Sequence, residues 1–87
     1  MKLTISPRAE KELKKISKIY QIIIAKKIKS LVEVKILNEE KISGFKDIFR
    51  VRVGEYRIVY RKTSQEIYIV LIHHRKDVYR LVNQLLK

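Results

Sequence analysis

Four arginines at positions 50, 52, 57 and 61 could bind a polyanion, because their spacing places them on one face of a sheet. Arg50 and Arg52 lie two residues apart, and alternate side chains of a strand leave the same face. A two-residue turn at positions 54 and 55 would put Arg57 directly opposite Arg52, with Arg61 on the same face. Like charges about 5 Å apart across two strands repel one another. We therefore expect this solvent-facing set, together with Lys46, to bind phosphate groups.

A solvated face neutralised by carboxylates is the alternative interpretation, with Asp47, Glu55 and Glu66 as the available partners. The net charge favours the polyanion, since 21 Lys and Arg against 9 Asp and Glu give +12 over 87 residues. Such a field attracts nucleic acid, an anionic membrane or an acidic protein. A lysine-rich composition typical of an AT-rich or heat-loving organism would explain the charge without a ligand. Arginine dominates the C-terminal part, however, and arginine suits planar, bidentate contacts with phosphate.

Two histidines and a tyrosine follow the arginines and could move protons. His73 and His74 are adjacent on a strand, so only one of them can face the arginines, and the alternation does not decide which. Tyr79 lies four residues after Arg75. Taken singly, such residues are more often structural, the histidines within a strand and the tyrosine packed at a sheet edge. Their proximity to the arginines is what indicates chemistry.

The composition excludes several other classes of protein. Without cysteine there is neither a disulfide nor a thiolate metal site, and two adjacent strand histidines do not make a zinc site, so we expect no metal or cofactor. The apolar runs are far shorter than the roughly 20 residues that cross a bilayer. The N-terminus lacks the apolar segment of a secretory signal. We expect one cytoplasmic domain over residues 1–87 and no membrane partner.

The elements that must position these residues follow from the hydrophobic pattern, which predicts an α+β fold of order β-α-α-β-β-β-α. A helical hairpin should pack on a small, antiparallel-rich sheet. Ser6 and Pro7 are typical of a helix start, and Gly54 suits a type II′ hairpin turn. The predicted strands are residues 2–5, 48–53, 56–62 and 66–73. The predicted helices start at residue 7, run over 19–35 and run over 77–86, with a loop at 37–46.

The hairpin and the closing segment resemble the RelE/ParE toxin superfamily, and more specifically its RelE-type mRNA interferases from type II toxin–antitoxin modules. The resemblance rests on Gly44, the hairpin over 49–60 and the His-Arg-Lys-Asp-Val-Tyr-Arg segment at 74–80, and it extends to the opening at 6–13. It covers nearly the whole chain. It implies a RelE-like fold and an endoribonuclease that cleaves mRNA, commonly in the ribosomal A site.

The resemblance also implies roles for individual residues. Arg57, Arg75, His74 and Tyr79 correspond to catalytic positions, and Arg50 and Arg52 to a basic pair. Some relatives carry lysine at that pair, whereas arginine does not readily give up its proton, so Arg50 and Arg52 are expected to stabilise charge. Together with Arg61 and Lys46 they form the expected RNA-binding set.

The implied reaction needs no metal, because RNA supplies its own nucleophile, the 2′-hydroxyl. The protein must align that hydroxyl, take its proton, stabilise the phosphorane and protonate the leaving 5′-oxygen. An imidazole at His74 is suited to acid–base work near neutral pH. Tyr79 could act as acid or base, or it could stack on a nucleobase. The products would be a 2′,3′-cyclic or 3′-phosphate and a 5′-hydroxyl.

Two other functions fit the same fold. A ParE-like protein would inhibit DNA gyrase without nuclease chemistry, and a non-catalytic relative would bind RNA without cutting it. The expected partners are mRNA, the ribosome and an acidic, RelB-like antitoxin that folds onto the toxin, with a heterotetramer as the expected assembly.

Overall fold

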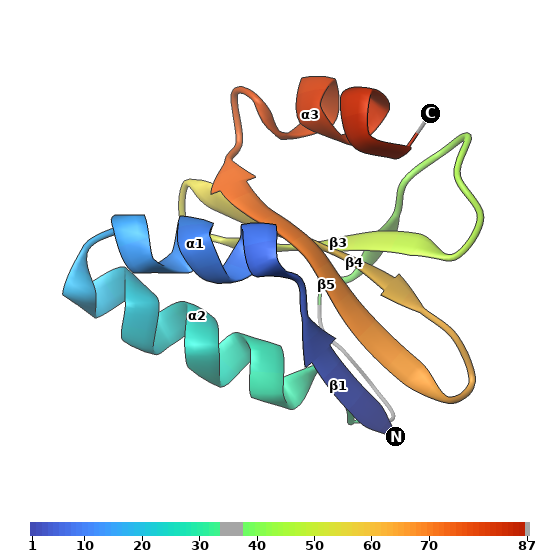
Figure 1. Ribbon diagram of the computed structural model, residues 1–87, viewed down its shortest axis with the longest axis horizontal. Coiled ribbons are helices and arrows are strands. Elements are labelled where there is room, and N and C mark those ends of the chain that lie inside the picture. Colours follow the sequence, from blue (N-terminus) through green and yellow to red (C-terminus); the bar gives the residue numbers. More distant parts are fainter. Residues whose placement is uncertain (34–37, 87) are drawn as a thin grey trace.

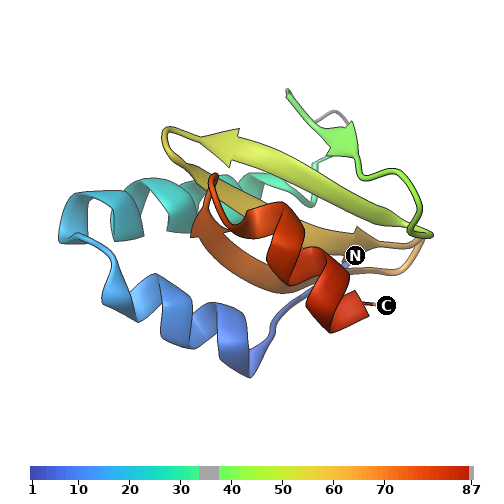
Figure 2. The same cartoon turned by 90° about the horizontal axis from the view of Figure 1, so that it is seen from above.

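The computed structural model describes residues 1–33 and 38–86, which form one five-stranded sheet with helices on both faces (Figures 1 and 2). Helices α1 and α2 lie against one face of the sheet, and α3 lies against the other. The elements run in the order β1 (Lys2–Ile5), α1 (Pro7–Lys15), α2 (Lys18–Ser30), β2 (Glu40–Lys41), β3 (Ile48–Val53), β4 (Tyr56–Lys62), β5 (Glu66–His74) and α3 (Val78–Leu86).

The sheet has the strand order β1-β5-β4-β3-β2. Strand β1 pairs with β5 in parallel, and all other pairs are antiparallel, which confirms the predicted α+β class and antiparallel-rich sheet. The bounds of β1, β3 and β4 agree with the prediction, and β5 extends one residue further, to His74. A β-bulge interrupts the β4–β5 ladder, because Val59 pairs with Leu71 while Tyr60 pairs with Ile69.

The larger differences from the prediction lie between α2 and β3. Helix α2 ends at Ser30, whose hydroxyl donates a hydrogen bond to the carbonyl of Lys27 at 2.6 Å. The predicted helix continued to residue 35, of which residues 34 and 35 lie outside the described part, as does residue 37 of the predicted loop. Strand β2 lies within that loop and pairs with Arg50 and Phe49 of β3. Two residues are too few to show an alternating pattern, so hydrophobic periodicity does not predict this strand.

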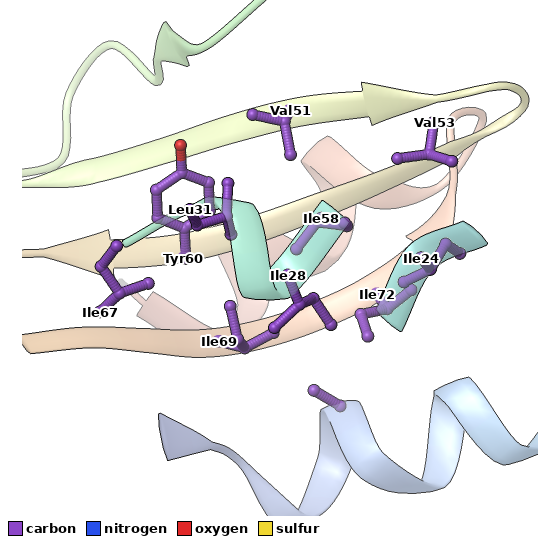
Figure 3. Packing of buried hydrophobic residues seen from close by; sticks show 11 residues of the cluster. Ile24, Ile28, Leu31, Val51, Val53, Ile58, Tyr60, Ile67, Ile69 and Ile72 are labelled. Atoms are coloured by element: carbon purple, nitrogen blue, oxygen red, sulfur yellow. The ribbon is translucent and has the colours of Figure 1, made fainter. Parts of the chain in front are cut away.

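The apolar core divides into two clusters, one on each face of the sheet. The larger cluster packs Ile24 and Ile28 of α2, and Leu31 directly after that helix, onto β3, β4 and β5 (Figure 3). The smaller cluster contains residues of α3 and of the arginine-bearing face, namely Ile42, Ile48, Val59, Leu71, Val78, Leu81 and Val82. The sequence predicted that the arginine face is solvent-facing. In the structure it is only partly so. Its apolar middle is covered by α3, and this brings the first turn of α3 close to the arginines.

A serine fixes the start of α1 to the sheet. The Ser6 hydroxyl accepts a hydrogen bond from the Ala9 amide at 3.0 Å and donates one to the Val70 carbonyl at 2.9 Å. This confirms Ser6 as the N-cap and ties the helical hairpin to β5. Among the described residues, no helix is long and apolar enough to cross a membrane.

Candidate nucleic-acid interface

The β3–β4 hairpin places three arginines side by side. Arg52 pairs directly with Arg57, and Arg50 pairs with Val59 one step along the ladder, so all three side chains share a face. The connecting turn has φ of +58° at Gly54 and no positive φ at Glu55, which is the predicted type II′ pattern. A Cβ at Gly54 would lie 2.6 Å from the Tyr20 hydroxyl, so a larger residue would have to displace the Tyr20 ring as well as adopt a positive φ.

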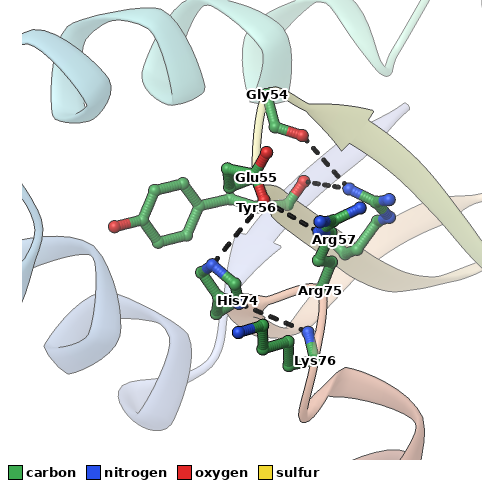
Figure 4. A network of polar contacts seen from close by, with 7 residues as sticks. All are labelled: Gly54, Glu55, Tyr56, Arg57, His74, Arg75 and Lys76. Carbon is green, nitrogen blue, oxygen red and sulfur yellow. Dashed lines mark hydrogen bonds and ion pairs between the residues drawn. The ribbon is translucent and has the colours of Figure 1, made fainter.

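Arg57 is the most enclosed of the arginines, with 9% of its surface exposed. Its Nη1 donates to the carbonyls of Gly54 and Tyr56, both at 3.2 Å (Figure 4). Burial lowers the pKa of Arg57, and the positive charges of Arg50, Arg52 and Arg75 lower it further, while Tyr79 acts in the opposite direction. We call Arg50, Arg52, Arg57 and Arg75 the arginine cluster. Its charges oppose one another, and a bound anion would relieve that repulsion.

Arg50 links the arginine cluster to α3. Its Nη2 lies 2.8 Å from a carboxylate oxygen of Glu40 on β2, and its guanidinium carbon lies 6.0 Å from the centre of the Tyr79 ring. Tyr79 stands in the first turn of α3 and is 44% exposed. The predicted proximity of Tyr79 to the strand arginines is thus present in the structure.

Arg75 is held at the end of β5 by the hairpin turn. Its Nε lies 2.8 Å from a carboxylate oxygen of Glu55, and its amide donates to the Glu55 carbonyl at 2.8 Å (Figure 4). Of the three carboxylates proposed to neutralise the arginine face, only Glu55 pairs with an arginine among the described residues. The Glu66 carboxylate instead accepts from the Thr4 hydroxyl. Within the described chain no carboxylate pairs with Arg52, which is exposed.

The two histidines lie on opposite faces, as expected, and it is His73 that pairs with Arg57. Its Nδ1 is buried and has no hydrogen-bond partner among the described residues. His74 pairs with Tyr56 and lies against that ring at 6.1 Å, with its Nε2 3.8 Å from Glu55 (Figure 4). The His74 Nδ1 accepts from the Lys76 amide at 3.3 Å. Its catalytic role stays a prediction, and the structure places His73 on the face of the arginine cluster.

Arg61 and Lys46 lie apart from the cluster. Arg61 pairs with Ile48 at the opposite end of β4 from Arg57, four residues away, or roughly 13 Å along the strand. Both side chains are exposed. The structure therefore brings together five of the eight predicted site residues, namely Arg50, Arg52, Arg57, Arg75 and Tyr79.

Comparison with known families shows which protein family the chain belongs to. Residues 3–79 match the family described as the ParE toxin of the type II toxin-antitoxin system, parDE. The chain belongs to this toxin family. This match confirms the RelE/ParE toxin superfamily, which the hairpin and the closing segment predicted. No curated protein matches the sequence.

Solved structures of RelE proteins and of YoeB share the fold of this ParE-family toxin. The toxin of the RelB-RelE antitoxin-toxin complex from Methanococcus jannaschii matches with a TM-score of 0.75 at 25% identity, over 90% of this chain and 96% of that one. A double arginine-to-alanine mutant of the E. coli toxin RelE in the free state matches with a TM-score of 0.73 at 20% identity, over 98% and 97%. YoeB from Staphylococcus aureus matches with a TM-score of 0.69 at 25% identity, over 86% and 97%.

One polar residue of this site, Glu40, was not predicted from the sequence. Glu40 lies in the segment predicted as a loop, and only the pairing of β2 with β3 brings its carboxylate to Arg50. A surface ion pair of this kind is worth about 0–1 kcal/mol, so a phosphate can replace Glu40 at little cost. In the described part of the toxin, no three His, Cys, Asp or Glu side chains gather closely enough to hold a metal ion.

Proposed function

We propose that this ParE-family toxin is an endoribonuclease that cleaves mRNA, with the scissile phosphate bound at the arginine cluster. The observation that carries the proposal is the enclosure of Arg57 among three further arginines that lower its pKa. A charged group is seldom kept so close to like charges unless an anion binds there. RNA supplies both the phosphate and the attacking 2′-hydroxyl.

Arg57 is suited to stabilise the phosphorane. The two carbonyls that it contacts fix the guanidinium in place, and its remaining N–H groups can donate to phosphate oxygens without reorganisation. Arg50 and Arg52 add charge on the same face. Since arginine keeps its proton, the proton transfers need other groups.

Tyr79 is the group that we propose for proton transfer. Its ring lies beside Arg50, and its phenol stands half-exposed in the first turn of α3, where a bound RNA could reach it. His73 is a second candidate because it pairs with Arg57, and His74 is the candidate from the family resemblance. The position of Tyr79 at the start of α3 also fits RNA entering along the cluster.

Primer extension on translated mRNA tests the cleavage. Wild type, Arg57→Ala and Tyr79→Phe are expressed briefly in cells, and new 5′ ends are mapped. We expect the two variants to lower cleavage at least 10²-fold, as loss of a transition-state contact does. Arg8→Ala and Tyr68→Phe are matched controls, because Arg8 lies on α1 across the sheet and Tyr68 lies at the far end of β5. Intact transcripts in cells arrested by the wild type would refute the nuclease.

Inhibition of DNA gyrase is the second candidate, and the family match favours it. A gyrase inhibitor would use the basic face to bind protein, without cutting RNA. Purified gyrase in a supercoiling assay separates the two, since an RNA-cleaving toxin leaves supercoiling unchanged. Strong binding of RNA without new 5′ ends, and without an effect on gyrase, would point to a non-catalytic RNA-binding relative.

An acidic antitoxin is the partner that we propose for storage of the toxin. The charge of +12 favours an acidic segment, and the RelE proteins from Methanococcus jannaschii and E. coli are solved as complexes with RelB. Three exposed isoleucines on α2, Ile19, Ile22 and Ile23, offer an apolar surface to the same partner. Coexpression with a neighbouring acidic reading frame should abolish toxicity and yield a stable complex, whose mass tests the expected heterotetramer. Toxicity that persists would count against this partner.

A further inference from the structure

A cleft of about 310 Å³ opens between the β2 segment and α3, directly beside the arginine cluster. Ile42, Phe45 and Val82 supply its apolar wall, and Arg50 and Tyr79 belong to both the cleft and the candidate site. A ligand whose phosphate is held by the arginines can therefore extend into the cleft without leaving the protein surface. The cleft is large enough for one flat heterocyclic ring and its sugar.

The lining has the chemistry of a nucleobase site. An exposed tyrosine ring and apolar side chains can contact the faces of a planar base, as in other proteins that bind single-stranded RNA. Polar groups lie at the rim, where the edge of a base would be read. These are Glu40, Lys41, Ser43 and Asn83.

Asn83 presents a hydrogen-bond acceptor. Its Nδ2 donates to the Tyr79 carbonyl at 3.1 Å, and because a carbonyl only accepts, this contact fixes which end of the amide faces the helix backbone. The Oδ1 atom has no donor among the residues that the structure describes. The Asn83 Oδ1 can therefore accept a hydrogen bond from a ligand, while one hydrogen of Nδ2 is bound to the Tyr79 carbonyl.

We propose that this cleft binds the base of the nucleotide whose phosphate lies at the arginine cluster, and that Asn83 selects adenine and cytosine. Adenine carries an amino group at C6 and cytosine one at C4, and each can donate to the Asn83 Oδ1. Guanine and uracil carry a carbonyl at the same positions, which would repel Oδ1. The inference rests on the proposed binding of RNA, and it adds which bases the site prefers.

Binding without turnover tests the inference separately from cleavage. The toxin is titrated with adenosine 3′-monophosphate against inosine 3′-monophosphate, and with the cytidine against the uridine compound, while the Asn83 side-chain amide is followed by NMR. In each pair a carbonyl replaces the amino group, and the adjacent ring nitrogen changes from an acceptor to an N–H donor. We expect the amino compounds to bind roughly 3–10-fold more tightly, the range that one hydrogen bond gives.

Variants locate the effect at Asn83. Asn83→Leu should bind all four nucleotides with similar affinity, because leucine has no acceptor to offer the amino group of a base. Gln84→Ala, an exposed neighbour on α3 outside the cleft, is the matched control. Equal affinities in the wild type, no measurable nucleotide binding, or a preference that survives Asn83→Leu would overturn the inference.

The outcomes for cleavage and for selection are independent. If the toxin cuts mRNA but shows no amino-group preference, the proposed function stands and the assignment to Asn83 is wrong. If the preference is present but no mRNA is cut, the base site stands and the nuclease is wrong.

Discussion

Arg57 lies directly opposite Arg52 across the β3–β4 hairpin, yet Arg57 is nearly buried and Arg52 is exposed. The difference arises because Arg57 folds back onto the carbonyls of Gly54 and Tyr56, while Arg52 has no hydrogen-bond or ion-pair partner among the described residues. The pair thus combines a fixed guanidinium with a free one. Such an arrangement can hold a phosphate at a defined position and still attract a strand of RNA.

The position of Arg52 relative to Arg61 leads to a prediction about salt dependence. Arg52→Ala should lower the affinity for a short single-stranded RNA and reduce the slope of log affinity against log salt by about 0.7. Arg61→Ala removes the same charge from an exposed position at the far end of β4, so its effect should be clearly smaller. Fluorescence anisotropy between 50 and 200 mM salt measures both. Equal effects would mean that the RNA follows the whole strand.

Removal of the Glu40 charge should strengthen RNA binding. Glu40→Gln frees Arg50 from its ion pair, so a phosphate no longer has to displace a carboxylate. We expect affinity to rise a few-fold at low salt, in line with about 0–1 kcal/mol for an exposed pair. Glu10→Gln removes the same charge from an ion pair on α1 and serves as the control. Weaker binding by Glu40→Gln would show instead that Glu40 holds Arg50 in its binding position.

The two glycines with positive φ predict different costs of substitution. Gly54→Ala should lower the free energy of unfolding by about 1–3 kcal/mol, because φ is +58° and the new Cβ would meet Tyr20. Gly44→Ala, with φ of +85° and open space around the Cβ, should cost only the backbone term of about 1 kcal/mol. Urea denaturation measures both. A Gly44→Ala variant as unstable as Gly54→Ala would argue against the contact with Tyr20.

Tyr60 makes stability fall at alkaline pH. Burial raises the pKa of Tyr60, and its hydrogen bond to Glu39 raises the pKa further. The unfolded chain then ionises first, near pH 10, so the stabilising contribution is complete below that pH and is lost as pH rises towards the folded pKa. Tyr60→Phe should flatten this decline above pH 10. Urea titrations at several pH values, together with tyrosinate absorbance, measure this dependence. An equal loss of stability in the wild type and in Tyr60→Phe would contradict a role for Tyr60.

Much of the fold can be read from local patterns. The alternation in β3 and β4, the glycine at the turn and the serine-proline start of α1 each depend on near neighbours in the chain, and all three agree with the structure. Strand β2 escaped prediction because it is too short to carry a pattern and exists through its pairing with β3. The end of α2 at Ser30 was likewise not marked by glycine or proline.

In the candidate site, too, some features depend on near neighbours in the chain and others on contacts between distant segments. Strand period and hairpin register, both local, determined that Arg50, Arg52 and Arg57 share a face. Which histidine joins them was not decided, because the bulge opposite Val59 and Tyr60 shifts the phase of β5, and a bulge depends on the partner strand.

The sequence by itself therefore determined the elements other than β2, the arginine face and the toxin superfamily, since these depend on residue type and spacing along the chain. Only the tertiary structure decided that α3 packs across that face and brings Tyr79 and Asn83 to the arginines. It also turned His74 away from them and set Glu40 against Arg50. These relations join residues that are distant in sequence, and burial of the apolar side of α3 against the sheet is what holds them in place.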